Sequence, residues 1–187
     1  ADDMREYGGI LTLDDLRRYE VRERDIVQST YRGYEIRGIG PCSSGGVILA
    51  QALNILEGSD LAAIGFGNAR SVHVVAEALK IAFADRAQYL GDPDEAPVPV
   101  EWLASKEYAD RRRADIDPTR AKIHRSGTAI PGEPGFDEAS EAAKLRRGEP
   151  ASVESANTTH VTACDREGNM VSTTQTLNGA FGSFVTV

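Results

Sequence analysis

The residues with the clearest chemical potential lie late in the chain, where the sequence reads Asn157-Thr158-Thr159-His160. A threonine hydroxyl in mid-chain is a weak nucleophile, because the residue carries no base of its own. At a new amino terminus the same residue has an α-amine. The unperturbed pKa of such an amine is about 7.7–8.0, so part of it is neutral near physiological pH and can take the hydroxyl proton. Cleavage after Asn157 would therefore turn Thr158 into a nucleophile with a built-in base.

The same residues also have a purely structural interpretation. Threonine is β-branched and favours strands, so Thr158 and Thr159 could simply begin one. We assign His160 packing or hydrogen bonding within that strand rather than catalysis, because no acid or second histidine lies at a suggestive spacing. His73 and His124 receive no catalytic role for the same reason.

The elements around Thr158 indicate a β-hairpin. Two β-rich runs, residues 159–164 and 170–176, flank a loop at 165–169 that contains aspartate, glycine and asparagine. A third apolar run covers residues 181–187. A hairpin with one further strand is marginally stable by itself, so we expect this region to be the front of a larger sheet.

The first part of the chain is predicted to be mainly helical. Thr12 and Asp15 have the spacing of a capping box. Residues 21–28 and 31–39 are expected to be extended, with a turn at Gly33 between Arg32 and Tyr34. Helices are expected over residues 13–19, 47–56, 70–90 and 105–114. The longest helix has an apolar stripe at three- and four-residue steps, made of Val72, Val75, Ala76, Leu79, Ala82, Phe83, Ala87 and Leu90.

Residues 117–157 have a different character, with few apolar residues and many prolines and glycines. Such a stretch buries too little apolar area to offset its ordering entropy, so it should be mobile or wrapped on a surface, with one weak helix over 137–147. We therefore divide the chain into a helical segment, a flexible tail before the cleavage site, and the start of a β-sheet. These parts are residues 1–116, 117–157 and 158–187.

Composition narrows the function classes. The chain has 187 residues, 41% hydrophobic and 27% charged, which is typical of globular proteins. Its 21 basic and 29 acidic side chains give a net charge of -8, which argues against a nucleic-acid partner. No apolar run approaches the roughly 18 residues of a membrane span. Cys42 and Cys164 have no metal-binding spacing and leave the compartment undecided.

The sequence resembles the gamma-glutamyltranspeptidase family along almost its whole length. Residues 157–183, NTTHVTACDREGNMVSTTQTLNGAFGS, are similar to the start of the family's small subunit. Upstream, several short segments resemble the large subunit and occur in family order: GGILTLDDL, YRGY, PCSSGG, LNILE, ADR and YLGDP. Only the tail at 117–154 has no specific counterpart.

The resemblance implies a role for four residues. Thr158 would be the catalytic nucleophile, freed by self-cleavage after Asn157, where the family more often has glutamine. Thr176 would be a second threonine whose hydroxyl contacts and tunes the nucleophile, and Asn178 would bind the α-amino end of the substrate. Without the family, Thr176 is a strand threonine and Asn178 a turn residue before Gly179.

The fold that the resemblance implies is α+β, as part of the αββα sandwich of N-terminal nucleophile hydrolases. A helical large-subunit segment would be followed by the first β-hairpin of the small subunit. The implied activity is transfer and hydrolysis of gamma-glutamyl groups from glutathione and related amides, with no cofactor or metal. The partners would be a small gamma-glutamyl substrate and the rest of the same precursor, which supplies the carboxylate-binding and oxyanion-hole residues. The 187-residue chain alone should therefore be inactive. The family implies a periplasmic or secreted protein, and a cytoplasmic one stays possible.

Three other interpretations stay open. A related amide acylase, similar to cephalosporin acylase, could share the same nucleophile. A non-catalytic binding relative would keep the bond after Asn157 intact. A nucleotide-binding module could use the glycine-rich loop at 40–46, but this loop lacks the lysine and spacing of a P-loop. The alternative use for the loop is to bind a carboxylate or to pack near the active site. Asp85 and Arg86 are expected to form an internal ion pair.

Overall fold

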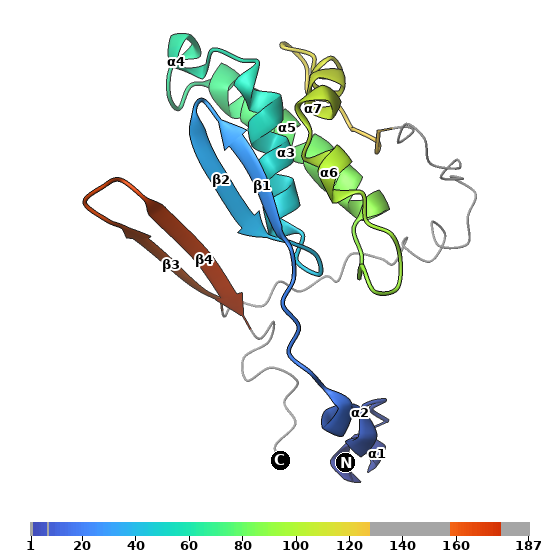
Figure 1. Ribbon diagram of the computed structural model, residues 1–187. Coiled ribbons are helices and arrows are strands. Elements are labelled where there is room, and N and C mark those ends of the chain that lie inside the picture. The colour runs from blue at the N-terminus through green and yellow to red at the C-terminus, as the bar shows by residue number, and fades with distance from the viewer. Residues whose placement is uncertain (1, 7, 128–157, 177–187) are drawn as a thin grey trace. The chain divides into compact units, whose positions relative to one another are not determined.

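A computed structural model describes residues 2–6, 8–127 and 158–176 of the chain (Figure 1). The chain divides into two compact units. One is Glu23–Arg147, and the other combines Ala1–Arg22 with Gly148–Val187. Each unit is described by itself.

The larger unit begins with an antiparallel hairpin of β1 (Ile26–Tyr31) and β2 (Tyr34–Ile39), in which Ile26 pairs with Ile39. The connection has two residues, Arg32 and Gly33, with φ angles of 50° and 86°. Two successive positive φ angles are typical of a type I′ turn, whose twist matches that of the strands. The predicted turn at Gly33 is therefore confirmed.

Helix α3 (Gly45–Glu57) is the centre of this unit and lies between the β1–β2 hairpin and helix α5 (Figure 1). Two glycines allow the helix to approach β2 closely. A Cβ atom on Gly38 would lie 2.6 Å from the Cα of Gly46, and one on Gly46 would lie 2.3 Å from the carbonyl oxygen of Ile39. The glycine at 46 thus serves helix–strand packing.

Two hydrophobic clusters surround α3. One contains Val27, Val47, Ala50, Tyr89, Leu103 and Tyr108. The other contains Ile55, Leu56, Val74, Ala78, Ile81 and Ala109. The remaining helices of the unit are α4 (Leu61–Ile64), α5 (Ala69–Tyr89), α6 (Val100–Leu103) and α7 (Lys106–Arg113).

The apolar face predicted for α5 was wrong. Val72, Leu79 and Phe83 are 59%, 39% and 53% exposed. The buried face carries two carboxylates, Glu77 and Asp85, beside the apolar side chains of the core clusters. Both carboxylates are tied to partners distant in sequence, so hydrogen bonding decides which face is packed.

Glu77, only 1% exposed, holds a segment that follows α7. Its carboxylate accepts hydrogen bonds from the Lys80 ammonium at 2.6 Å and from the Lys122 backbone amide at 3.2 Å. The His124 Nε2 atom lies 2.7 Å from the same carboxylate. His73 contacts the Asp117 carbonyl oxygen at 2.7 Å, at the start of the segment.

Asp85 is fully buried and anchors the end of the segment, accepting a 2.7 Å hydrogen bond from the Gly127 amide and another from Gln51. Its cationic partner is Arg112, with Nε at 3.4 Å, and the expected Asp85–Arg86 ion pair is absent. Arg86 is exposed and donates instead to the Ser44 hydroxyl at 2.9 Å. Residues 117–127 are therefore wrapped on α5 and α7, while 128–157, including the weak helix expected there, lie outside the described residues.

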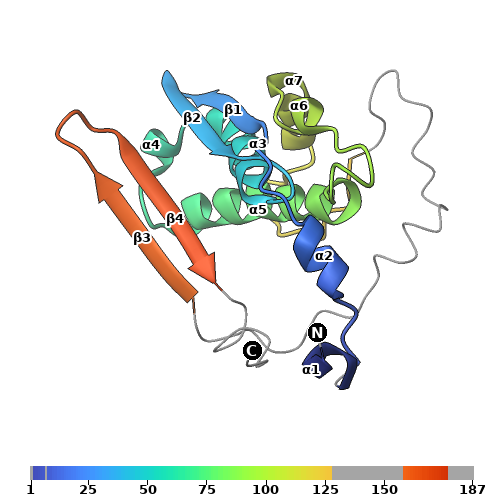
Figure 2. The same cartoon turned by 60° about the horizontal axis from the view of Figure 1, so that its bottom comes forward.

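The smaller unit contains α1 (Asp2–Glu6), α2 (Leu13–Arg18) and a hairpin of β3 (Thr158–Cys164) and β4 (Met170–Thr176). The capping box before α2 is confirmed. The Asp15 amide donates to the Thr12 hydroxyl at 3.2 Å, and the Thr12 amide donates to the Asp15 carboxylate at 2.8 Å. The antiparallel course of β3 and β4 is visible in Figure 2. The expected strand at 181–187 lies outside the described residues.

Glu77 should make the stability of the complete protein depend on pH. Burial raises the pKa of its carboxyl, but hydrogen bonds from Lys80, His124 and the Lys122 amide prevail and lower it to about 2. A folded-state pKa below the ordinary value of 4.5 stabilises the folded protein above about pH 4.5, and this contribution is lost as the pH falls toward 2. Glu77→Gln should therefore lower Tm by roughly 5 °C near pH 7 and by much less near pH 3.

Glu107→Gln is the matched control, because Glu107 is 64% exposed and pairs only with Arg111 on the surface of α7. Thermal unfolding of the three proteins at both pH values measures the effect. Equal Tm changes for the two variants near pH 7 would show that the buried carboxylate has no special role.

Candidate active site

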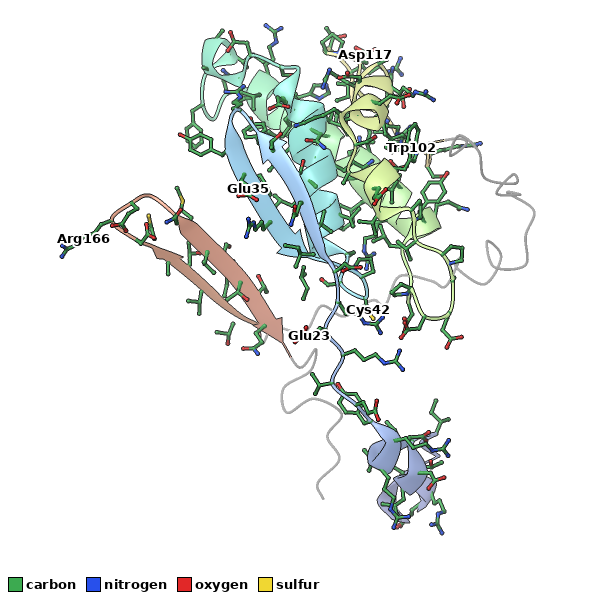
Figure 3. All side chains as sticks on the ribbon, in the orientation of Figure 1. Glu23, Glu35, Cys42, Trp102, Asp117 and Arg166 are labelled. Atoms are coloured by element: carbon green, nitrogen blue, oxygen red, sulfur yellow. The ribbon has the colours of Figure 1, made fainter. Side chains whose placement is uncertain are left out.

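The turn between β3 and β4 fixes how the two strands pair. The Asp165 amide donates to the Asn169 carbonyl at 3.0 Å, and the Gly168 amide donates to the Asp165 carbonyl at 3.4 Å. Gly168 has a φ of 88°, so this is a three-residue turn closed by a glycine bulge. Hydrogen bonds from the Asn169 side chain and amide hold the pKa of the Asp165 carboxyl below its usual value. Arg166 is at the tip of the turn (Figure 3).

This register puts Thr158 opposite Thr176. The backbone hydrogen bond from Asp165 to Asn169 makes 165–169 a hydrogen-bonded pair. Hydrogen-bonded and non-hydrogen-bonded pairs alternate along antiparallel strands. The 158–176 pair is therefore of the non-hydrogen-bonded kind, for which the Cα atoms are about 4.5 Å apart. The two threonines expected to act together are thus neighbours in the backbone, and a contact between their hydroxyls stays a prediction.

His160 belongs to the same strand face, two pairs further along, opposite Thr174. Its Nδ1 atom lies 2.8 Å from the Thr174 hydroxyl, and its Nε2 atom lies 3.1 Å from the hydroxyls of Thr162 and Ser172. The expected hydrogen-bonding role is confirmed. Two of the partners are on the other strand, so spacing around position 160 alone could not identify them. Asn157 and Asn178 lie outside the described residues.

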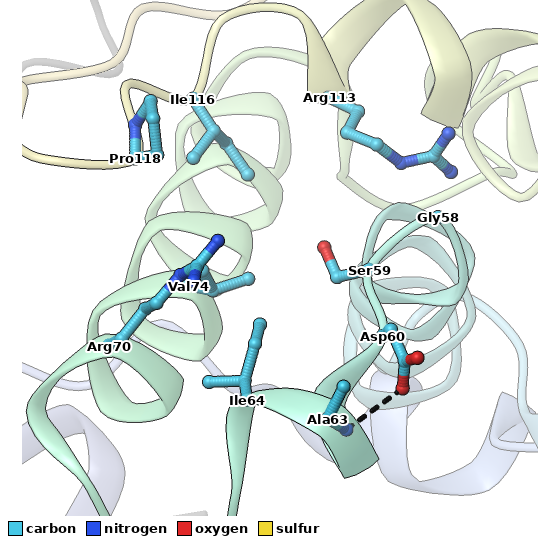
Figure 4. Close-up of a pocket in the computed structure, with 10 residues that line it drawn as sticks. All are labelled: Gly58, Ser59, Asp60, Ala63, Ile64, Arg70, Val74, Arg113, Ile116 and Pro118. Carbon is cyan, nitrogen blue, oxygen red and sulfur yellow. Dashed lines mark hydrogen bonds between the residues drawn. The ribbon is translucent and has the colours of Figure 1, made fainter.

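The larger unit has a pocket of about 500 Å³ between the end of α3, helices α4 and α5, and the residues after α7 (Figure 4). Arg113 lines it, but its guanidinium donates to the carbonyls of Ile55 and Asn54 at 2.7 and 2.9 Å. Asp60 caps α4 through the Ala63 amide at 3.0 Å. Among its lining residues there is no nucleophile paired with a base, and none of the predicted site residues.

A smaller pocket of about 330 Å³ lies beside the glycine-rich loop, lined by Cys42, Ser44, Arg86, Ala87, Leu90 and Gly91. Figure 3 labels Cys42, in the loop between β2 and α3. Arg86 is its only cationic lining residue, and it already donates to Ser44. The lining contains no lysine, so it lacks the group that a P-loop uses to hold phosphates.

The described residues mix helix and strand, and the fold is similar to a solved relative. The crystal structure of Helicobacter pylori gamma-glutamyltranspeptidase matches with a TM-score of 0.62 and 44% sequence identity, over 65% of this chain and 35% of that chain. This similarity places the chain among the N-terminal nucleophile hydrolases.

The sequence comparisons narrow the class to one family. The profile of the gamma-glutamyltranspeptidase family matches residues 1–187, and the chain belongs to this family. It is 48% identical to the acylase ACY 1 proenzyme of Pseudomonas sp. strain V22, over 99% of this chain and 29% of that protein. It is 39% identical to the glutathione hydrolase proenzyme of Escherichia coli K12, over 98% of this chain and 28% of that protein.

The chain thus spans less than a third of the length of these relatives. In the ranges 2–6, 8–127 and 158–176, no helix has both the length and the apolar character needed to cross a membrane.

The pairing of Thr158 with Thr176 leads to a test on the complete protein. We propose that the Thr176 hydroxyl bonds to that of Thr158. Thr176→Val should then slow cleavage after Asn157 by roughly 10-fold, because a hydrogen bond to a reacting group is lost, whereas Thr176→Ser should retain most of the rate. Intact-mass analysis over time measures the rate. Thr173→Val, on the other face of β4, is the control. If it slows cleavage as much as Thr176→Val does, the proposed contact is wrong.

Proposed function

We propose that the complete protein transfers and hydrolyses gamma-glutamyl groups through an acyl-enzyme on Thr158. Two observations support the proposal. The family match extends over the entire chain, and the β3–β4 register sets Thr176 opposite Thr158 in the backbone. The register is the observation that carries it, because it brings together the two hydroxyl residues that the resemblance implies for the site.

The first step is cleavage of the precursor. The Thr158 hydroxyl oxygen attacks the carbonyl carbon of Asn157, and the peptide C–N bond breaks as an ester forms. Water then hydrolyses that ester, which leaves a carboxylate on Asn157 and a free α-amine on Thr158. The amine is the general base of the mature enzyme.

The second step uses the freed residue. The Thr158 oxygen attacks the γ-carbonyl carbon of the substrate while its α-amine accepts the hydroxyl proton and passes it to the leaving amine. Water breaks the resulting ester to give glutamate, or the amino group of an acceptor breaks it to give a new amide. The amine and hydroxyl supply the proton transfers, so we propose no cofactor.

The substrate-binding side of the site should come from the rest of the precursor, which would remain associated as a second subunit. Each donor of an oxyanion hole contributes roughly 2.7–4 kcal/mol to transition-state stabilisation. The resemblance places these donors and the carboxylate-binding residues outside the present chain. We therefore expect the isolated 187-residue chain to be inactive.

A second candidate is amide acylase activity on other acyl groups. The identity of 48% to an acylase proenzyme exceeds the 39% to the Escherichia coli glutathione hydrolase proenzyme. Both candidates use the same nucleophile, and they differ in whether the site binds the α-amino group of a glutamyl substrate.

The nucleophile is tested by the mass of the complete protein. Wild type should divide into two pieces, the second beginning at Thr158, and Thr158→Ala should remain one chain because the attacking hydroxyl is gone. Thr159→Ala is the adjacent control and should still divide, since its side chain is on the other face of β3. A mature second piece that begins at any other residue would rule out the proposed mechanism.

The substrate is tested with two amides of the same leaving group, a gamma-glutamyl anilide and the glutaryl anilide that lacks only the α-amino group. A site built to bind the amino group should prefer the gamma-glutamyl compound by about 100-fold or more in kcat/KM, because its buried polar groups are otherwise unpaired. Asn178→Ala should reduce that preference. A preference for the glutaryl compound would assign the protein to the acylases. The isolated 187-residue chain is the inactive control.

A further inference from the structure

We propose that His160 is a positioning residue for Thr158, acting through the hydroxyls that its imidazole binds. This inference rests on the proposed function. The hydroxyl cluster is defined here as Thr162, Ser172 and Thr174, the three residues whose side chains contact the ring. The proposed catalytic steps assign no part to this imidazole.

The cluster and the nucleophile share one face of the hairpin. The pairs His160–Thr174 and Thr158–Thr176 are separated by one intervening pair, so the four residues belong to the same face of the hairpin. A strand rises about 3.4 Å per residue, which sets the two pairs roughly 7 Å apart. Both are non-hydrogen-bonded pairs, in which opposite side chains come closest. His160 is therefore next to the proposed reacting pair on the face that they share.

The protonation of the two ring nitrogens decides how the imidazole orients these hydroxyls. A neutral imidazole has one N–H and one acceptor nitrogen. If Nδ1 accepts, the Thr174 hydroxyl must turn its hydrogen toward the ring at 2.8 Å, and Nε2 donates to Thr162 or Ser172. If Nδ1 donates, the Thr174 oxygen faces the N–H and its own hydrogen is released for another partner. Either arrangement fixes the direction of the Thr174 hydroxyl.

Thr174 is the link to the reacting pair, because it precedes Thr176 by two residues on the same strand face. Threonine has a stiff χ1 torsion, so fixing its hydroxyl also fixes its methyl group. Among the three hydroxyl partners of the ring, Thr174 lies closest in register to the pair at 158 and 176. The contact at Nδ1 should therefore matter for the nucleophile, and the two contacts at Nε2 should matter mainly for the hairpin.

Two amide substitutions separate these contacts. The side-chain nitrogen of asparagine is as many bonds from Cα as Nδ1, and that of glutamine is as many bonds from Cα as Nε2. His160→Asn can thus retain the contact to Thr174, whereas His160→Gln can retain only those to Thr162 and Ser172. His160→Phe keeps an aromatic ring at this position and removes the contacts at Nδ1 and at Nε2.

The experiment uses the complete protein and measures cleavage after Asn157, kcat and KM for a gamma-glutamyl anilide, and Tm. His160→Phe should lower kcat about 10-fold at unchanged KM, the pattern of an interaction that acts in the chemical step. His160→Asn should recover kcat to within about 3-fold of wild type, and His160→Gln should stay close to His160→Phe. Thr174→Val should add little to His160→Phe, because both remove the same contact. Val161→Phe, on the other face of β3, is the control for an added ring.

Two results would overturn the inference. Equal kcat values for the asparagine and glutamine variants would remove the special role of Nδ1, even if His160→Phe failed to fold. Losses of kcat that follow Tm across all variants, including Val161→Phe, would leave His160 a purely structural residue. An active wild type in either case preserves the proposed function. An uncleaved, inactive wild type overturns the proposed function and this inference together.

Discussion

The candidate site depends on the register of one β-hairpin. Side chains on a strand alternate between two faces, so a slip of one residue would pair Thr158 with a different neighbour and move the hydroxyl residues of β4 to the other face. Three features of the turn oppose such a slip. They are the backbone hydrogen bond from Asp165 to Asn169, the positive φ of Gly168, and the Asp165 carboxylate, which accepts hydrogen bonds from the backbone and side-chain nitrogens of Asn169. The backbone position of Thr158, the proposed nucleophile, is thus set by turn chemistry seven residues away.

The helical unit is stabilised by two buried carboxylates on α5. Glu77 and Asp85 are eight residues apart on α5, about two helical turns, so both project from one face. Burying a carboxylate destabilises the folded state unless several hydrogen-bond donors satisfy it. Each of these two carboxylates accepts a hydrogen bond from a backbone amide of the segment after α7. The Tyr89 hydroxyl donates to the Gly127 carbonyl at the same place. A segment with few apolar residues can therefore be ordered, because hydrogen bonds to the helix replace apolar burial.

Local chemistry made part of this structure predictable. The capping box at Thr12, the turn at Gly33 and the loop before Met170 each depend on residues within a few positions of one another. The buried face of α5 was not predictable in this way. An apolar stripe measures only hydrophobicity, while the partners that bury Glu77 and Asp85 come from 27 to 47 residues away, apart from Lys80. The roles proposed for Thr158 and Thr176 depend on family resemblance, since a pair of strand threonines has no distinctive pattern of its own.

In this type of site, the location of the general base determines what the rest of the fold must provide. When nucleophile and base belong to the same residue, no fold is needed to bring them together, and a single cleavage creates both. What the fold must supply is the orientation of the acyl group and of the charge that develops on it. A nucleophile unit of this kind can therefore be shared by enzymes that act on different amides. This agrees with the similarity of the chain to acylase and glutathione hydrolase proenzymes alike. Identity over the nucleophile unit consequently says more about the chemistry than about the substrate.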